Sequence, residues 1–253
     1  MRNASLVPTL SPLPRFLVVA GVAGITAVAW FYLVAIDRSM SQSMGDMTMT
    51  SMNSDLSVIF AVWTVMMIGM MVGSAAPTLL LFGATRDGRG DRRASWAVLP
   101  FGLGYLIVWV GFSAVAALAE WWLRQTGMLS PALAVSQPLA GVIFIAVGAY
   151  QLSPLKSSCL RLCRSPLGFL MAHWRDGIGG ALRMGLDHGW YCLGCCWALM
   201  CVLFAVGTMN LAWVAGLSVL VLVEKIGPAG TLVARAVGVV MIVAGVLFAA
   251  GLM

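Results

Sequence analysis

Residues 184–201 of the chain read MGLDHGWYCLGCCWALMC, an apolar run that contains one aspartate, one histidine and four cysteines. Ionisable side chains are costly in lipid, so their presence in an apolar helix indicates a functional site. At about 100° per residue, a helix brings four of these side chains within an arc of roughly 80°: Met184, His188, Cys192 and Cys195. Cys196 lies at the edge of this arc. The run therefore predicts a helix with a stripe of soft metal ligands.

The composition predicts that this helix lies in a membrane. The chain of 253 residues is 61% hydrophobic and only 9% charged, with a mean hydropathy of +0.96. A soluble domain of this size lacks the polar side chains to cover such a core. The strands of a membrane barrel would alternate polar and apolar residues, whereas these apolar runs are continuous and long enough for helices. We expect an all-α integral membrane protein with a single domain.

We expect a bundle of about seven transmembrane helices, or six if the short run at 211–226 does not span. The expected helices cover residues 14–36, 56–82, 96–123, 135–152, 184–206, 211–226 and 232–252. Basic residues concentrate in the loop 84–95 and the segment 153–183, which predicts that both face the cytoplasm. The first run follows Arg2 and Arg15 and is longer than a signal-peptide core, so we expect it to be retained with a cytoplasmic N-terminus. The net charge of +6 is then explained by an excess of basic residues in the cytoplasmic loops rather than by nucleic-acid binding.

Residues 39–55 form a polar segment that we expect to be a loop on the outer face. Five methionines lie in it: Met40, Met44, Met47, Met49 and Met52. A loop has no core for them to fill, and a thioether binds Cu(I) even in an oxidising compartment. Met44 and Met47 are therefore candidate ligands for copper capture. A linker of biased composition, or a helix docked on the bundle, explains the segment equally well.

The expected helix 56–82 carries four methionines spaced as two pairs, one turn apart: Met66 and Met70, Met67 and Met71. A pair at this spacing can hold one soft ion, and repeated pairs can pass it along. Methionine also fills packed membrane interfaces, where small residues such as Gly69 and Gly73 are common. Taken alone, the four methionines are better explained by packing than by metal binding. The methionine-rich loop before them strengthens the metal interpretation.

The basic segment 153–183 carries Cys159 and Cys163, one helical turn apart. Its mixture of basic and apolar residues predicts an amphipathic surface helix, broken at Pro166. Cytoplasmic thiols stay reduced, so these two cysteines either receive Cu(I) or pack as buried thiols.

Four other residues have local interpretations. Glu224 and Lys225 predict an ion pair at the inner surface. Asp187 either caps its helix or orients His188 by a hydrogen bond. Cys201 lies about 180° around the helix from Cys192, so we exclude it from the metal site.

Four stretches form a distinctive combination: QLSPLK (151–156), CLRLCRSP (159–166), the run 185–200 and the methionine run 63–77. In them the chain resembles the bacterial family of predicted metal-binding integral membrane proteins, one branch of which accompanies a tyrosinase as its copper chaperone. The resemblance covers about residues 56–226. It implies that Cys192, Cys195 and Cys196 match the family's Cys-x-Gly-Cys-Cys-Trp element, and that the four paired methionines match its methionine run.

Thiolate and thioether ligands favour Cu(I), whereas zinc usually takes a closed Cys/His tetrahedron and hard cations need carboxylates. We therefore expect a Cu(I)-binding chaperone or conduit in the bacterial inner membrane. It would serve a periplasmic or membrane copper enzyme and catalyse no reaction itself. The candidate ligands are Cys192, Cys195, Cys196, His188, Met66, Met67, Met70, Met71, Met44 and Met47.

Two alternatives come from other classes of protein. A membrane thiol–disulfide oxidoreductase would use Cys192 and Cys195 as a redox pair. A structural or assembly subunit of a larger membrane complex would bury its cysteines at close helix contacts, where Gly185, Gly189 and Gly194 let the backbones approach.

Overall fold

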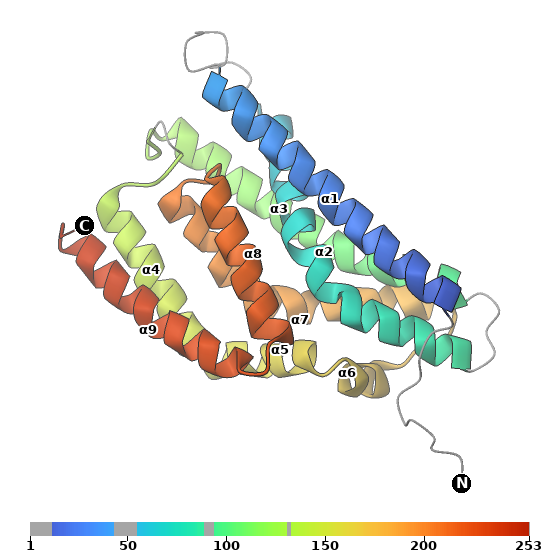
Figure 1. The fold of residues 1–253 in the computed structure, drawn as a ribbon. Helices are drawn as coiled ribbons and strands as arrows, with labels where there is room; N and C mark the ends of the chain where they lie inside the picture. The colour runs from blue at the N-terminus through green and yellow to red at the C-terminus, as the bar shows by residue number, and fades with distance from the viewer. Residues whose placement is uncertain (1–11, 43–54, 89–93, 131–132, 253) are drawn as a thin grey trace.

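The computed structural model describes residues 12–42, 55–88, 94–130 and 133–252 (Figure 1). Within these ranges the chain folds into nine helices, and its only strand-like pairing is an isolated bridge between Leu129 and Val135. The helices are α1 (Pro12–Gln42), α2 (Leu56–Gly88), α3 (Ala94–Gln125), α4 (Gln137–Leu152), α5 (Pro154–Arg164), α6 (Pro166–His173), α7 (Gly177–Val206), α8 (Leu211–Ile226) and α9 (Gly230–Ala249). The all-helical prediction is confirmed.

Five helices in the described ranges are long and apolar enough to cross a membrane: α1, α2, α3, α7 and α9. Helices α4 and α5 are joined by a bend of 61°, and the pair would be a sixth span only if both helices cross the membrane as one broken segment. Helices α4 and α8 have 16 residues each, fewer than the roughly 20 that a straight span needs. These helices make the chain a membrane protein, while the count of seven spans and the cytoplasmic N-terminus stay predictions.

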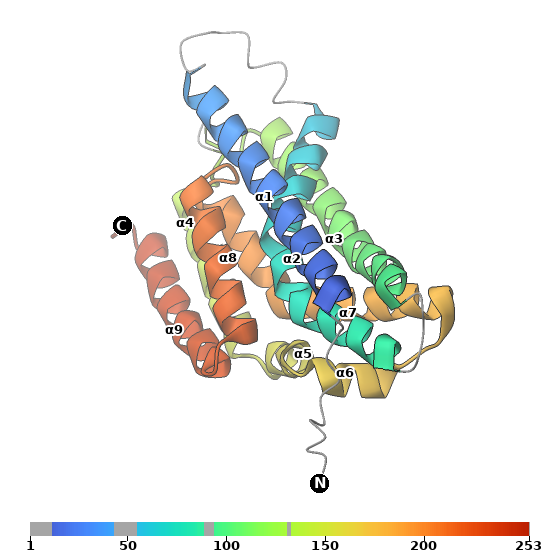
Figure 2. The ribbon, with the colours of Figure 1, turned by 45° about the vertical axis from the view of Figure 1, so that its right-hand side comes forward.

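Helices α1, α2, α3 and α7 pack in succession, α4 packs on both α7 and α9, and α8 contacts α2, α7 and α9 (Figures 1 and 2). The crossing of α3 and α7 depends on glycine, because a Cβ on Gly185 would collide with the backbone of Phe101. The crossing of α4 and α9 uses glycines in the same way, at Gly141 and Gly148 against Gly245 and Gly238. Helix α7 lies in the middle of the bundle, in contact with α3, α4, α5 and α8.

The short helices α5 and α6 lie across one end of the bundle, which we call the α5–α6 end (Figures 1 and 2). Each begins with a proline at its first position, Pro154 and Pro166, where the missing N–H costs nothing. Helix α5 packs on α7 and α6 on α2. The predicted break at Pro166 therefore separates two helices, and α5 brings its cysteines onto α7.

The opposite end contains residues 207–210, which connect α7 to α8, and we call it the α7–α8 end. Helix α2 also begins there, after Asp55. The Asp55 carboxylate accepts a hydrogen bond from the backbone N–H of Ser57 (2.9 Å), which lowers the pKa of the carboxyl and stabilises the first turn.

Candidate metal site

Helix α7 carries the central side chains of the site. It is continuous from Gly177 to Val206, and His188, Cys192, Cys195 and Cys196 are all buried in the core, each at most 3% exposed. Because α7 begins ten residues before Asp187, the interpretation of Asp187 as a helix cap is wrong. Its carboxylate instead pairs with Arg183, one turn earlier on α7 (3.5 Å).

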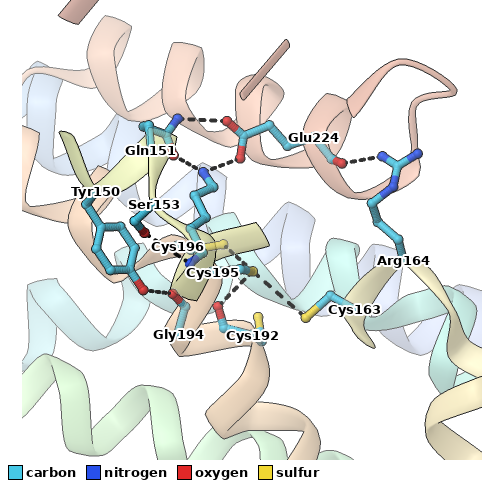
Figure 3. Close-up of polar contacts among 11 residues, drawn as sticks. Tyr150, Gln151, Ser153, Cys163, Arg164, Cys192, Gly194, Cys195, Cys196 and Glu224 are labelled. Atoms are coloured by element: carbon cyan, nitrogen blue, oxygen red, sulfur yellow. Dashed lines mark hydrogen bonds and ion pairs between the residues drawn. The ribbon is translucent and has the colours of Figure 1, made fainter. Parts of the chain in front are cut away.

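The thiols lie close together along one side of α7 (Figure 3). The Sγ atom of Cys195 lies 3.3 Å from Cys196 Sγ and 3.8 Å from Cys163 Sγ, and its thiol donates to the Cys192 carbonyl oxygen (3.1 Å). We call Cys163, Cys195, Cys196 and Cys192 the thiol row. All six cysteines of the chain are free thiols. The structure thus brings together the three predicted cysteines of α7 and adds Cys163 from α5.

Gly194 makes room for a further thiol. A Cβ at this position would lie 2.8 Å from Cys159 Sγ, so the missing side chain lets Cys159 approach α7. The hydroxyl of Tyr150 donates a hydrogen bond to the Gly194 carbonyl oxygen on the same side (Figure 3). The glycine of the Cys-x-Gly-Cys-Cys motif therefore admits the side chain of Cys159 from α5 rather than a second backbone.

Cys192 has partners from two other helices, which the sequence did not predict. The Lys225 ammonium of α8 donates to Cys192 Sγ (2.8 Å) and to Ser74 Oγ of α2 (3.0 Å). The Tyr105 hydroxyl of α3 lies 3.1 Å from Cys192 Sγ and donates to the Met71 carbonyl oxygen (2.9 Å). In the sequence, Tyr105 and Lys225 are each a polar side chain within an apolar run. Such side chains are found in membrane helices mainly at functional sites.

The predicted ion pair between Glu224 and Lys225 is wrong, because adjacent residues on a helix point about 100° apart. Glu224 instead binds Lys156 of α5 (2.6 Å) and Gln151 of α4 (2.9 Å), all three buried. Arg164, at the other end of α5, donates to the Glu224 carbonyl oxygen (2.5 Å; Figure 3). Glu224 thus ties α5, and with it Cys163, to α8.

Changing Glu224 to glutamine is expected to destabilise the fold by about 3–5 kcal/mol, because Lys156 would stay buried without a carboxylate partner. The free energy of unfolding in dodecyl sulfate measures this loss. Asp187→Asn is the matched control, since its partner Arg183 has a side chain that is 60% exposed. Equal losses in the two variants would contradict a structural role for the buried pair.

His188 lies in an aromatic pocket rather than in the thiol row. Its ring centroid is 5.1 Å from that of Phe169, 5.8 Å from Tyr105 and 6.0 Å from Phe101. Its Nδ1 atom is buried and has no hydrogen-bond partner among the residues that the structure describes. A buried ring nitrogen without a partner keeps His188 a candidate ligand beside Cys192, one turn away on α7.

The four paired methionines of α2, Met66, Met67, Met70 and Met71, are each at most 2% exposed. They belong to the same core as the cysteines of α7, and the Tyr105 hydroxyl joins the Met71 carbonyl to Cys192 Sγ. Met44 and Met47 lie outside the described residues.

The geometry suits a soft ion bound by few ligands. In the described ranges, no group of three or more His, Cys, Asp or Glu side chains is spaced to hold a metal ion, so the thiols form a row rather than a closed cage. Two sulfur ligands about 2.3 Å from one metal lie about 3.8 Å apart at a tetrahedral angle and about 4.6 Å apart in a line. The Cys195–Cys163 separation of 3.8 Å lies at the short end of this range, so a small movement would let both sulfurs bind one ion.

Taken together, the apolar helices and the buried thiols beside methionines define a helical membrane protein with a cluster of soft metal ligands. The chain belongs to the PpoB2 family of copper chaperones, which matches residues 60–248, about three quarters of its length. The resemblance found in the sequence is thereby confirmed. Comparison with the curated proteins and with the solved structures finds no match.

Proposed function

We propose that this copper chaperone holds Cu(I) at the thiol row in the bacterial inner membrane and hands it to a periplasmic or membrane copper enzyme. The observation that carries the proposal is the spacing of Cys195 between Cys196 (3.3 Å) and Cys163 (3.8 Å) in a buried core. Adjacent thiols let an ion bind a new sulfur before it leaves the old one, so it moves by ligand exchange. The protein catalyses no reaction in this role.

The surroundings of the row support a singly charged soft ion. One Cu(I) with two thiolates has a net charge of −1, and a buried charge needs a partner. The ammonium of Lys225, 2.8 Å from Cys192 Sγ, supplies the compensating charge. Arg86 near the end of α2 and the basic segment 153–183 give the α5–α6 end the charge bias of a cytoplasmic face. In that orientation, Cys163 of α5 lies at the cytoplasmic end of the thiol row.

One observation favours the thiol–disulfide alternative, which is the position of Lys225 beside Cys192. A lysine next to a cysteine activates the thiol. Against it, Cys192, Cys195 and Cys196 are each 1% exposed, and a redox enzyme must reach a partner's cysteine. A buried row accepts a small ion far more readily than another protein's disulfide.

Metal analysis of the purified protein tests the proposal. Protein from cells grown with added copper is expected to contain about one copper per chain, and protein from cells grown with added zinc to contain no stoichiometric zinc. A copper-free enzyme of the tyrosinase type, added to the loaded protein, should gain activity. A chain that contains no copper under these conditions would refute the proposal, and a redox-dependent mobility shift without metal would support the oxidoreductase.

A further inference from the structure

Two adjoining hollows lie at the α7–α8 end, away from the thiol row. The larger is an open depression of about 440 Å³, lined by Asp37, Met209, Asn210 and their neighbours. The smaller, of about 20 Å³, lies between α1, α2 and α8, and its lining includes Met66, Val62 and Thr208. Asp37, Met209 and Leu211 line both. The open depression therefore leads to a cavity large enough for one ion or one water molecule.

The small cavity has the chemistry of a cation site. Met66 and Met209, whose side chains carry thioethers, line it, and Asp37, which carries a carboxyl group, lines both hollows. The Thr208 hydroxyl, 2% exposed, has no hydrogen-bond partner among the described residues. Buried hydroxyls are almost always paired, so an unpaired one lining a cavity indicates that a ligand completes its bonding.

We propose that Met66, Met209 and Thr208 form an entry site at which a soft monovalent cation, Cu(I) in this chaperone, first binds on its way to the thiol row. The inference rests on the proposed function, since it adds the place where the cargo enters. Hard cations need six or more oxygen ligands, which this cavity does not supply, whereas thioethers select Cu(I) and Ag(I). The negative charge of Asp37 attracts the cation into the open depression.

The position of Met66 on α2 links the entry site to the thiol row. Met66 and Met70 are one turn apart, and Met71 is about 7.5 Å further along the axis than Met66. The Met71 carbonyl accepts the hydrogen bond from Tyr105, whose hydroxyl lies beside Cys192 Sγ. The methionines of α2 thus run from the entry site to the level of Cys192, where the Met71 carbonyl and Cys192 share the Tyr105 hydroxyl.

The rate of loading tests the entry site. The unmodified chain, Met209→Leu and Met66→Leu are each mixed with Cu(I) held by a chromophoric chelator, and the transfer is followed over time. Leucine keeps the volume of methionine but removes the sulfur, so both variants should fold. Each is expected to load at least 10-fold more slowly and to reach the same final copper content. Met241→Leu, which changes a buried methionine of α9, is the matched control and should load at the normal rate.

A second measurement isolates the site from the thiols. A chain with all six cysteines replaced by serine is titrated with Ag(I), a redox-inert substitute for Cu(I). One Ag(I) should bind, and Met209→Leu in this background should weaken its binding at least 10-fold. Normal loading by Met209→Leu in the unmodified chain would overturn the entry site and show that the cavity holds only water. That result would leave the proposed function intact, whereas no copper at the thiols of the unmodified chain would refute the function itself.

Discussion

Replacing Cys195 by serine is expected to weaken Cu(I) binding about 100-fold, equivalent to about 2.8 kcal/mol. Cys195 lies between two sulfur neighbours, Cys196 and Cys163, so its loss separates these two. A hydroxyl is a hard ligand and a poor substitute for a thiolate on Cu(I). Competition against a Cu(I)-selective chelator measures the change in dissociation constant.

Cys201→Ser is the matched control, because it makes the same chemical change on the same helix. Cys201 is only partly buried and lies about 180° from Cys192 around α7. It should bind copper as the unmodified chain does. If Cys195→Ser keeps its affinity while the protein still binds copper, the ion is held by the α2 methionines and the thiol row is not the site. Equal weakening in both variants would indicate a general loss of structure.

Changing Lys225 to methionine is expected to have opposite effects on stability and on copper binding. Within the described residues, the Lys225 ammonium contacts a thiol and a hydroxyl but no carboxylate, so the metal-free protein buries an uncompensated charge. Removing such a charge should stabilise the metal-free protein by about 1–3 kcal/mol. The same change removes the charge that balances a Cu(I)–dithiolate group, so copper should bind about 10-fold more weakly.

Thermal unfolding of the metal-free protein and chelator competition measure the two effects separately. Lys225→Arg keeps the positive charge and should retain most of the copper affinity. A purely structural role for Lys225 predicts a different result, in which Lys225→Met lowers the melting temperature and leaves copper affinity unchanged. That result would show that Lys225 takes no part in copper binding.

The sequence predicted the helical class because the apolar runs are long and the charges few. It predicted the stripe on α7 because that arrangement depends on the periodicity of one helix. Local rules also placed a break at Pro166, where α5 and α6 are separate helices. They did not predict that α7 starts at Gly177, because Arg183 and Asp187 make its first turns look like part of the basic segment.

The remaining parts of the site come from contacts between helices that are distant in sequence. Cys163, Tyr105 and Lys225 lie 32, 87 and 33 residues from the α7 cysteines they meet. Periodicity shows which side of a helix is special, but it does not show which helix will face that side. The wrong prediction of an ion pair between Glu224 and Lys225 has the same cause, because each of these side chains binds residues that are distant in the sequence.

Glu224 holds both ends of α5, through its carboxylate to Lys156 and its carbonyl to Arg164, and the next residue of α8 is Lys225. One turn of α8 therefore fixes the surroundings of Cys163 at one end of the thiol row and of Cys192 at the other. We therefore expect a displacement of that turn to change the surroundings of both ends of the thiol row together.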